Sequence, residues 1–248
     1  MSPTNRIYHY CKLDTAIESI LPLNELLLNN FNKTNDPREY KSFLFAEKYW
    51  KKEHLLDSDM EIANQKISEI LRSDCKFISF SQDFKDFFGY EYARMWSYYG
   101  ANHKGICLEI DKNEFISENS GKIDPLLFRK IQYKEFKINK PYKTIFVDHT
   151  KLFKLGEAYL KNDFRKRYFK ELFFIKDIEW ASEHEFRLLF YSKKFHEKEY
   201  CSIKKSLKKI FFGVDFNMNY LPSVKNICPN IDLYSLKYEG LRLNPYKI

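Results

Sequence analysis

Residues 183–191 carry the clearest pattern of apolar and polar positions in the chain, Glu-His-Glu-Phe-Arg-Leu-Leu-Phe-Tyr. Side chains on a β-strand alternate between its two faces with a period of two residues. A strand that starts near Ser182 therefore has one face with Glu183, Glu185 and Arg187 and an opposite face with His184, Phe186 and Leu188. The ionisable face has two interpretations, a ladder of structural ion pairs or the floor of a catalytic cleft.

The rest of the chain predicts short strands and helices in alternation. Strands are predicted at 7–10, 26–28, 77–81, 105–111, 128–133, 185–191 and 207–214. Helices are predicted after Asp14 and at 40–55, 59–73, 90–99 and 150–174, with a turn and helix start at Asn35-Asp36-Pro37. The tail after Asn219 shows no clear pattern.

These elements predict a single α+β domain over residues 1–248, because no Ser-, Pro- or Gly-rich linker divides the chain. We expect a mixed, mostly antiparallel central sheet flanked by helices. The block at 40–73 is predicted to be a helical insertion over that sheet, and 150–174 is a second candidate insertion.

Composition limits the classes of partner. The formal net charge of +8 is compatible with an anionic partner such as a nucleic acid, a dinucleotide or a membrane surface, and equally with a solubility role for the lysines. The basic stretch from Lys193 to Lys209 has the same two interpretations. Glycine is scarce, at 7 residues, and no Gly-rich phosphate-binding motif occurs.

The five cysteines are scattered and show no CxxC spacing, so neither a zinc site nor a disulfide framework is predicted. Cys75 and Cys107 lie beside apolar runs and are expected to be buried free thiols. The sequence has no secretory signal and no stretch long enough to span a bilayer. We therefore expect a cytoplasmic protein with no membrane association.

Two strands carry candidate binding residues. Arg6 and His9 lie on opposite faces of the first strand, and either could hold a phosphate or a ribose hydroxyl. Ser79 and Ser81 share the face opposite Phe80, where their hydroxyls could orient a carboxylate or a ligand. In the alternative interpretations, the aromatic residues of the first strand pack in a core, and the two serines form a small polar outer face of their strand.

The segment from Tyr92 to Gly105 is aromatic and ends in a polar loop. Tyr92, Trp96 and Tyr99 have helical spacing, which core packing explains. Tyr98 and His103 are candidates for binding an aromatic, phosphorylated ligand, with a plain turn as the alternative for the loop.

The pair Glu183 and Glu185 suits chemistry in which positive charge develops on a sugar carbon. One carboxylate can stabilise the oxocarbenium-like centre, and the other can act as a general base. In the structural alternative Glu185 pairs with Arg187 or a lysine, which is worth only about 0–1 kcal/mol if the pair is exposed.

Several segments, in order along the chain, resemble the bacterial family known as domain of unknown function 2971 (DUF2971). The matching pieces are Ile7-Tyr8-His9-Tyr10, Asn35-Asp36-Pro37-Arg38-Glu39, Phe77-Ile-Ser79-Phe80-Ser81, Met95-Trp96-Ser-Tyr98-Tyr99, His103-Lys104-Gly105-Ile106-Cys107, and Lys176 with Trp180–Arg187. Members are often encountered in bacterial defence and mobile-element settings. The resemblance therefore suggests an anti-phage or toxin role.

A second resemblance concerns chemistry. The order Arg6, Ser79-Phe80-Ser81 and Glu183-His184-Glu185 is similar to the arginine, Ser-x-Ser and Glu-x-Glu pattern of the ADP-ribosyltransferase superfamily. The resemblance implies that Glu185 is the catalytic carboxylate at the nicotinamide ribose of NAD and that Glu183 activates the acceptor. Arg6 would hold the cofactor phosphates or ribose, and both serines would support the site.

The sequence departs from that pattern at two positions. Phe80 stands where the superfamily has a small polar residue, and Arg187 stands where apolar residues are common. His9 could take the role of Arg6, as in the branch of the superfamily that uses histidine, tyrosine and glutamate.

The leading hypothesis is a transferase-type effector that cleaves NAD and passes ADP-ribose to a protein, a nucleic acid or water. NAD is then the substrate and no metal is predicted. The candidate residues are Glu183 and Glu185 as catalytic groups, with Arg6, His9, Ser79, Ser81, Tyr98, His103 and Arg187 in the cofactor site. The alternatives are a nucleic-acid-directed effector such as a metal-dependent nuclease, and a non-enzymatic sensor or interaction module.

Overall fold

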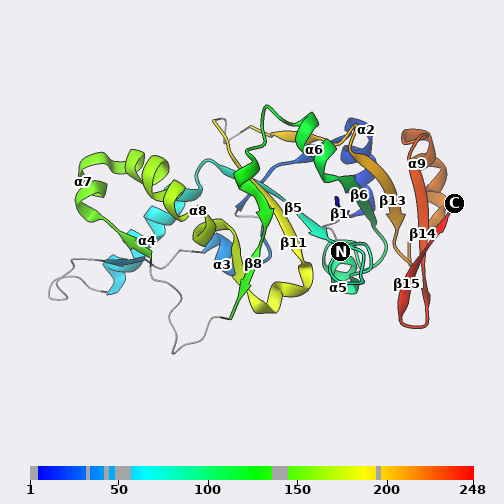
Figure 1. The fold of residues 1–248 in the computed structure, drawn as a ribbon, viewed down its shortest axis with the longest axis horizontal. Coiled ribbons are helices and arrows are strands. Elements are labelled where there is room, and N and C mark those ends of the chain that lie inside the picture. The colour runs from blue at the N-terminus through cyan, green and yellow to red at the C-terminus, as the bar shows by residue number, and fades with distance from the viewer. Residues whose placement is uncertain (1–4, 32–33, 42–44, 48–56, 136–144, 194–196) are drawn as a thin grey trace.

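The computed structural model describes residues 5–31, 34–41, 45–47, 57–135, 145–193 and 197–248 (Figure 1). Up to residue 111 the elements are β1 (Arg6–Cys11), α1 (Leu13–Thr15), η1 (Ala16–Ile20), α2 (Leu21–Leu23), β2 (Glu25–Leu27), β3 (Asn29–Asn30), α3 (Pro37–Tyr40), β4 (Phe45–Glu47), α4 (Asp57–Arg72), β5 (Cys75–Gln82), α5 (Ala93–Tyr98) and β6 (Ile106–Asp111).

From residue 112 onward, helices and short strands precede the C-terminal strands. The elements are α6 (Lys112–Glu118), η3 (Pro125–Leu127), β7 (Phe128–Lys130), β8 (Gln132–Lys134), β9 (Ile145–Val147), α7 (His149–Ala158), η4 (Tyr159–Phe164), α8 (Arg165–Phe173), β10 (Ile175–Asp177), η5 (Ile178–Glu183), β11 (Glu185–Tyr191), β12 (Tyr200–Ser202), β13 (Leu207–Phe212), η6 (Met218–Tyr220), α9 (Leu221–Ile227), β14 (Asp232–Glu239) and β15 (Arg242–Lys247).

The largest sheet in the described part of the chain has nine strands, in the order β15-β14-β13-β6-β1-β5-β11-β7, with β3 paired to β5 outside this path. Strands β13 and β14 are parallel, and the other neighbours in this sheet are antiparallel. Pairs of short strands form three smaller sheets, β8 with β10, β2 with β12 and β4 with β9. The chain is therefore α+β with a mixed, mostly antiparallel sheet, as predicted.

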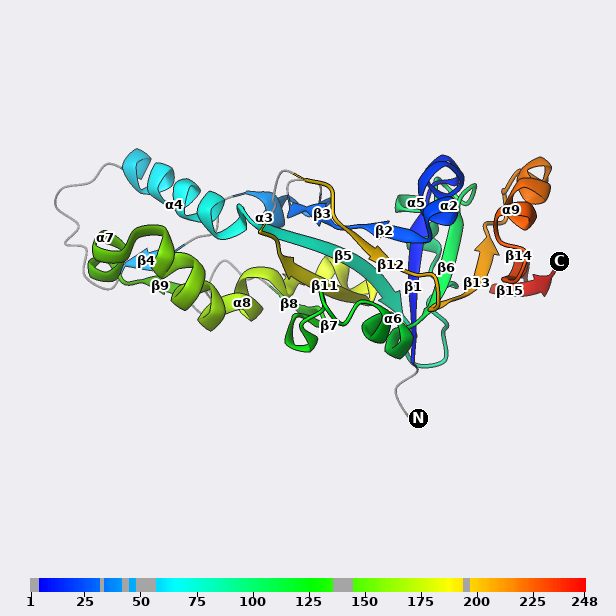
Figure 2. The ribbon, with the colours of Figure 1, turned by 90° about the horizontal axis from the view of Figure 1, so that it is seen from above.

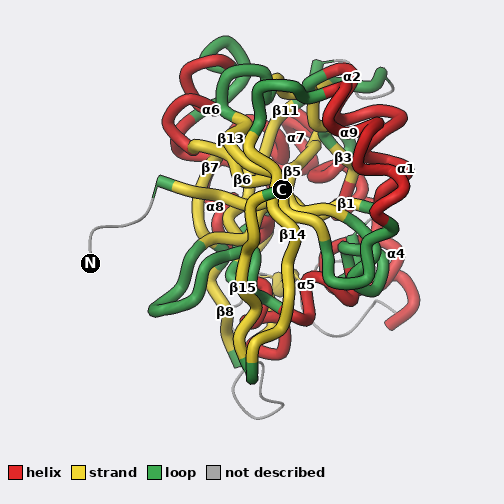
Figure 3. The backbone as a smooth tube through the Cα atoms, turned by 90° about the vertical axis from the view of Figure 1, so that its right-hand side faces the viewer, coloured by secondary structure: helices red, strands yellow, loops and turns green. Residues whose placement is uncertain are grey.

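The molecule is elongated. Helices α4 and α7 lie at one end, and β14, β15 and the C-terminus lie at the other (Figures 1 and 2). Viewed along the long axis from the C-terminal end, the strands lie at the centre with helices around them (Figure 3). None of the described helices is both long and apolar enough to cross a bilayer.

The two segments predicted as insertions pack against each other. Ile67 and Leu71 of α4 share a buried apolar cluster with Leu160 and Phe164 of η4. Strand β4 also pairs with β9, which directly precedes α7. The apolar cluster at this end of the molecule continues onto Phe77 and Leu189 of the central sheet.

Two predicted elements differ from the structure. Helix α3 ends at Tyr40, and residues 45–47 form β4 where a helix over 40–55 was predicted, because pairing with β9 overrides local propensity. Most of the remaining predicted helix lies outside the described residues. The predicted strand at 128–133 divides at Ile131 into β7 and β8, because the next residue donates its N–H to Phe174 and the chain leaves β11.

The other main elements occur close to their predicted positions. The helix predicted at 59–73 is α4, and the segment at 150–174 is helical with a break at Gly156, whose φ is 55°. All five cysteines are buried, Cys75 and Cys107 among them as predicted. The tail that showed no pattern forms α9, β14 and β15.

Strands β5 and β11 separate the core from the polar face. They are antiparallel neighbours, with Ser79 opposite Arg187 and Ser81 opposite Glu185. Phe80, Phe186 and Leu188 point into the main apolar core, as the period-two pattern predicts. The residues between them face the other way, and there they line a cavity.

Candidate functional site

A cavity of about 550 Å³ lies over the polar face of β5 and β11. Its volume falls in the range of about 300–1,000 Å³ that is typical of small-molecule sites. The lining includes seven of the nine candidate residues, namely His9, Ser79, Ser81, Tyr98, Glu183, Glu185 and Arg187. The tertiary structure therefore brings four separate sequence motifs to one place.

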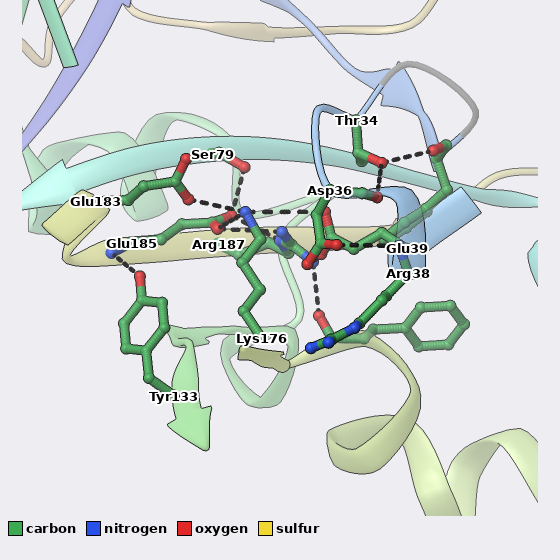
Figure 4. Close-up of polar contacts among 12 residues, drawn as sticks. Thr34, Asp36, Arg38, Glu39, Ser79, Tyr133, Lys176, Glu183, Glu185 and Arg187 are labelled. Atoms are coloured by element: carbon green, nitrogen blue, oxygen red, sulfur yellow. Dashed lines mark hydrogen bonds and ion pairs between the residues drawn. The ribbon is translucent and has the colours of Figure 1, made fainter. Parts of the chain in front are cut away.

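Five ionisable side chains in the cavity wall form what we call the charged cluster: Glu39, Lys176, Glu183, Glu185 and Arg187. Each of them is buried. Figure 4 shows Lys176 and Arg187 reaching between the three carboxylates. When every group is ionised, three carboxylates face two cations, so the cluster carries one excess negative charge.

Arg187 links two of the carboxylates. Its Nε lies 2.7 Å from Glu185 Oε1 and its Nη2 lies 3.1 Å from Glu185 Oε2, which is the two-pronged geometry that binds carboxylates well. Its Nη1 lies 2.5 Å from Glu39 Oε1 and donates to the carbonyl of Phe173 at 2.8 Å. The guanidinium is fully buried, so this network fixes its position.

Lys176 is the second cation of the cluster. Its Nζ lies 2.8 Å from Glu183 Oε2 and 2.8 Å from Glu185 Oε2, and 3.8 Å from Glu39 Oε2. Burial lowers the pKa of this ammonium, but the surrounding carboxylates outweigh burial and raise the pKa well above its usual value. Lys176 therefore stays charged.

Hydroxyl groups complete the contacts of the two glutamates predicted to be catalytic. Ser79 Oγ donates to Glu185 Oε1, and Tyr99 Oη donates to Glu183 Oε1 at 2.7 Å. Ser81 Oγ donates to the backbone carbonyl of Glu183 at 2.9 Å. The backbone N–H of Glu185 donates to Tyr133 Oη at 2.8 Å. Both carboxylates are thus held by neighbours from several elements.

The prediction that strand alternation alone brings both glutamates to one face is not met. Strand β11 begins at Glu185, whereas Glu183 ends the 3-10 turn η5, and His184 between them has a left-handed backbone with φ 44°. His184 stacks on Phe84 at a ring-centroid distance of 4.3 Å. The turn at His184 brings Glu183 to the same side as Glu185.

The charged surroundings separate the pKa values of two buried carboxyl groups. Burial raises the pKa of Glu185, but Arg187 and Lys176 outweigh burial and bring the pKa down to about 2. For Glu39 burial dominates and raises the pKa, although Arg187 and Lys176 act to lower it. Glu185 is therefore an anion at neutral pH, while Glu39 is the carboxyl more easily protonated.

Glu39, Lys176, Tyr99 and Tyr133 were not among the candidate residues. Glu39 follows the Asp36-Pro37 helix start, where the Asp36 side chain accepts the Arg38 N–H at 2.9 Å and caps α3. The Arg38 side chain pairs with Asp177, the neighbour of Lys176, which holds α3 beside β10. Glu39, Lys176 and Tyr99 all lie in segments that carry the family resemblance, and that was the available signal.

Arg6 and His103 do not belong to the cavity lining, so the structure does not support their predicted cofactor contacts. Arg6 lies at the start of β1, where its Nη2 lies 3.0 Å from Asp83 Oδ2 and its guanidinium lies over the ring of Phe88. His103 ends a left-handed turn with φ 65°, and its carbonyl accepts the Asp215 N–H. Both residues have structural contacts instead.

His9 and Tyr98, two other candidate cofactor contacts, line the cavity. His9 Nδ1 lies 3.2 Å from the carbonyl oxygen of Ser79, and burial lowers the pKa of the imidazole, which therefore stays neutral. Tyr98 is 60% exposed, so it is available at the cavity surface. Tyr99 packs against the apolar cluster that contains Trp96, as predicted, and its hydroxyl in addition belongs to the site.

Within the described ranges, no group of three or more histidine, cysteine, aspartate or glutamate side chains has the arrangement of a metal site.

Comparison with known proteins gives one match. No curated protein and no solved structure matches the chain. Residues 95–188, which carry α5, Lys176 and the Glu-x-Glu-x-Arg segment, match the model of the family described as protein of unknown function (DUF2971). Over these residues the chain matches this family, which is the family that its sequence motifs predicted.

Proposed function

We propose that this protein is an ADP-ribosyltransferase-like enzyme that cleaves NAD and passes ADP-ribose to a protein, a nucleic acid or water, as a defence or toxin-type effector. The observation that supports the proposal most is the hydrogen bond from Ser79 to Glu185 on adjacent strands inside one cavity. The superfamily resemblance assigns these roles, a supporting serine and a catalytic glutamate, to the same two residues.

The chemistry breaks the glycosidic bond between the ribose C1′ and the nicotinamide nitrogen. The electron pair of that bond goes to the ring, so a cationic pyridinium leaves as neutral nicotinamide and positive charge develops at C1′. Glu185, kept ionised by Arg187 and Lys176, would stabilise that charge. An acceptor O–H or N–H then attacks C1′, and its proton passes to Glu183 as the general base.

The remaining lining residues suit a dinucleotide. His9 replaces Arg6 as the candidate that contacts the cofactor, because only His9 of the two lines the cavity. Lys12 also lines it and is exposed, which suits contact with a diphosphate. The excess negative charge of the charged cluster suits the cationic nicotinamide ring at the other end of the ligand.

A second candidate function is a non-enzymatic sensor or interaction module. It is favoured by the pairing of both oxygens of Glu185 with Arg187 and Lys176, a geometry that a structural network would also have. In that case substitution of Glu185 lowers stability, and the protein turns over no NAD.

The deciding experiment is incubation of the purified protein with NAD, with and without cell lysate. Mass spectrometry then measures free nicotinamide, free ADP-ribose and ADP-ribose adducts. Nicotinamide release supports the proposal. Wild-type protein that neither binds nor consumes NAD contradicts the proposal and favours the non-enzymatic sensor or interaction module.

A further inference from the structure

One carboxylate oxygen of Glu39 accepts no hydrogen bond from any residue that the structure describes. Oε1 is held by Arg187 at 2.5 Å, but Oε2 is buried and has no hydrogen-bond partner among the described residues. Lys176 Nζ is 3.8 Å from Oε2, beyond hydrogen-bond distance, and is already bonded to Glu183 and Glu185. The residue itself is 8% exposed.

A buried polar oxygen without a hydrogen bond is costly, typically by about 1–3 kcal/mol, and is uncommon in folded proteins. Glu39 lines the cavity, so a bound molecule can reach it. Its position is fixed by Arg187 on one side and by the capped helix α3 on the other. An oxygen with these properties is a preformed hydrogen-bond acceptor for a ligand.

The position of Glu39 in the charged cluster indicates which part of the ligand it meets. Arg187 bridges Glu39 and Glu185 with different nitrogens of one guanidinium, so the two carboxylates are neighbours in the wall. If Glu185 lies at the ribose C1′ of NAD, the group attached to that carbon lies next to it. That group is the nicotinamide ring, and its carboxamide carries an N–H donor.

We propose that Glu39 Oε2 accepts a hydrogen bond from the nicotinamide carboxamide and thereby selects NAD over its deamidated analogue. The inference rests on the proposed function, because it takes NAD as the ligand. Nicotinic acid adenine dinucleotide has a carboxylate in place of the carboxamide. Its negative charge would face Glu39 and find no donor there.

Glu39→Gln gives a sharp test because it changes the polarity at one atom. The glutamine carbonyl can still accept from Arg187, whereas its amide nitrogen now donates where Oε2 accepted. We expect NAD to bind the variant about 10-fold more weakly and the deamidated dinucleotide to bind more tightly than it binds wild type. Calorimetry with each dinucleotide measures both changes.

Glu109→Gln is a matched control. Glu109 is also buried, at 4% exposure, and its Oε1 pairs with Lys209 at 3.0 Å. Its Oε2 has no hydrogen bond within the described part of the chain, and the residue does not line the cavity. This variant should bind both dinucleotides as wild type does. Thermal unfolding of each variant checks that the fold is intact. If Glu39→Gln does not fold, Glu39→Asp replaces it, because the shorter aspartate withdraws the oxygen but keeps the charge. Glu39→Asp should weaken NAD binding without improving binding of the deamidated form.

The outcomes separate the two proposals. Suppose that wild type binds NAD and that the Glu39→Gln variant, or Glu39→Asp in its place, binds both dinucleotides as wild type does. The role of Glu39 is then overturned and the proposed function stands. If wild type binds neither dinucleotide, both proposals are overturned. A weaker NAD complex together with a tighter deamidated complex in Glu39→Gln supports the proposed contact, because loss of shape or stability alone would weaken both.

Discussion

Arg187 Nε lies 2.7 Å from Glu185 Oε1, and the two residues are separated by one position on strand β11. Period-two alternation places both on the same face, away from the apolar core. The pair is fully desolvated, and a buried ion pair that loses one partner is far more damaging than an exposed one. This relationship makes Glu185 both a candidate catalytic group and a structural one, and the predictions below separate the two roles.

Glu185→Gln should abolish NAD turnover, with a loss of at least about 100-fold, because the neutral amide cannot stabilise the developing positive charge. The amide still accepts a hydrogen bond from Arg187, so the fold should survive with lower stability. Nicotinamide release measured beside thermal unfolding checks this. Turnover that falls only in proportion to the unfolded fraction would favour the structural module.

Arg187→Met should destabilise the protein strongly, by about 3–5 kcal/mol, because it leaves Glu39 and Glu185 buried with Lys176 as the one remaining cation of the cluster. The double variant Glu185→Met with Arg187→Met removes both charges and should recover part of that loss. Urea unfolding of the single and double variants measures the coupling. Equal stabilities of Arg187→Met and wild type would show that the network contributes nothing.

Stability should fall in acid because of Glu185. Its pKa in the folded state is about 2, below the ordinary value of 4.5, so folding favours the ionised form. The stabilisation is present above pH 4.5 and is lost as the pH falls toward 2, by an amount on the order of 3 kcal/mol. The unfolding free energy of wild type should therefore drop more steeply over this range than that of Glu185→Gln. Parallel curves for the two proteins would contradict the shift.

Ser79→Ala and Ser81→Ala form a pair that differs in what each hydroxyl holds. Ser79 donates to the Glu185 carboxylate, whereas Ser81 donates to the backbone of Glu183. We expect Ser79→Ala to reduce turnover about 10-fold with little change in stability, and Ser81→Ala to cost about 1–3 kcal/mol of stability. Steady-state kinetics and thermal unfolding of both variants test the contrast, which fails if the two profiles are alike.

His9 and Arg6 test which residue of β1 contacts the ligand. His9→Ala should weaken NAD binding, because His9 lines the cavity. Arg6→Ala should leave NAD binding within about twofold of wild type, because Arg6 does not line the cavity and contacts Asp83 and Phe88 instead. Calorimetric titration of both variants decides, and a larger loss for Arg6→Ala would restore its predicted role.

Local patterns were sufficient to predict much of the fold. Alternation placed Phe80, Phe186 and Leu188 in the core and Ser79, Glu185 and Arg187 on the opposite face, because strand geometry fixes which side chains share a face. The α+β class and the Asp36-Pro37 helix start also followed from short-range rules. The strand β4 did not, because its pairing partner β9 lies about a hundred residues away along the chain.

The sequence by itself determined the types of group in the site, since the Glu-x-Glu-x-Arg segment and the serines are written in it. Only the tertiary structure decided which distant residues join them. Packing of α3 against β10 brought Glu39 and Lys176 to Glu185, and the position of β1 brought in His9, while Arg6 pairs with Asp83 outside the cavity lining. Such contacts depend on the long-range register of strands and helices, which no local spacing encodes.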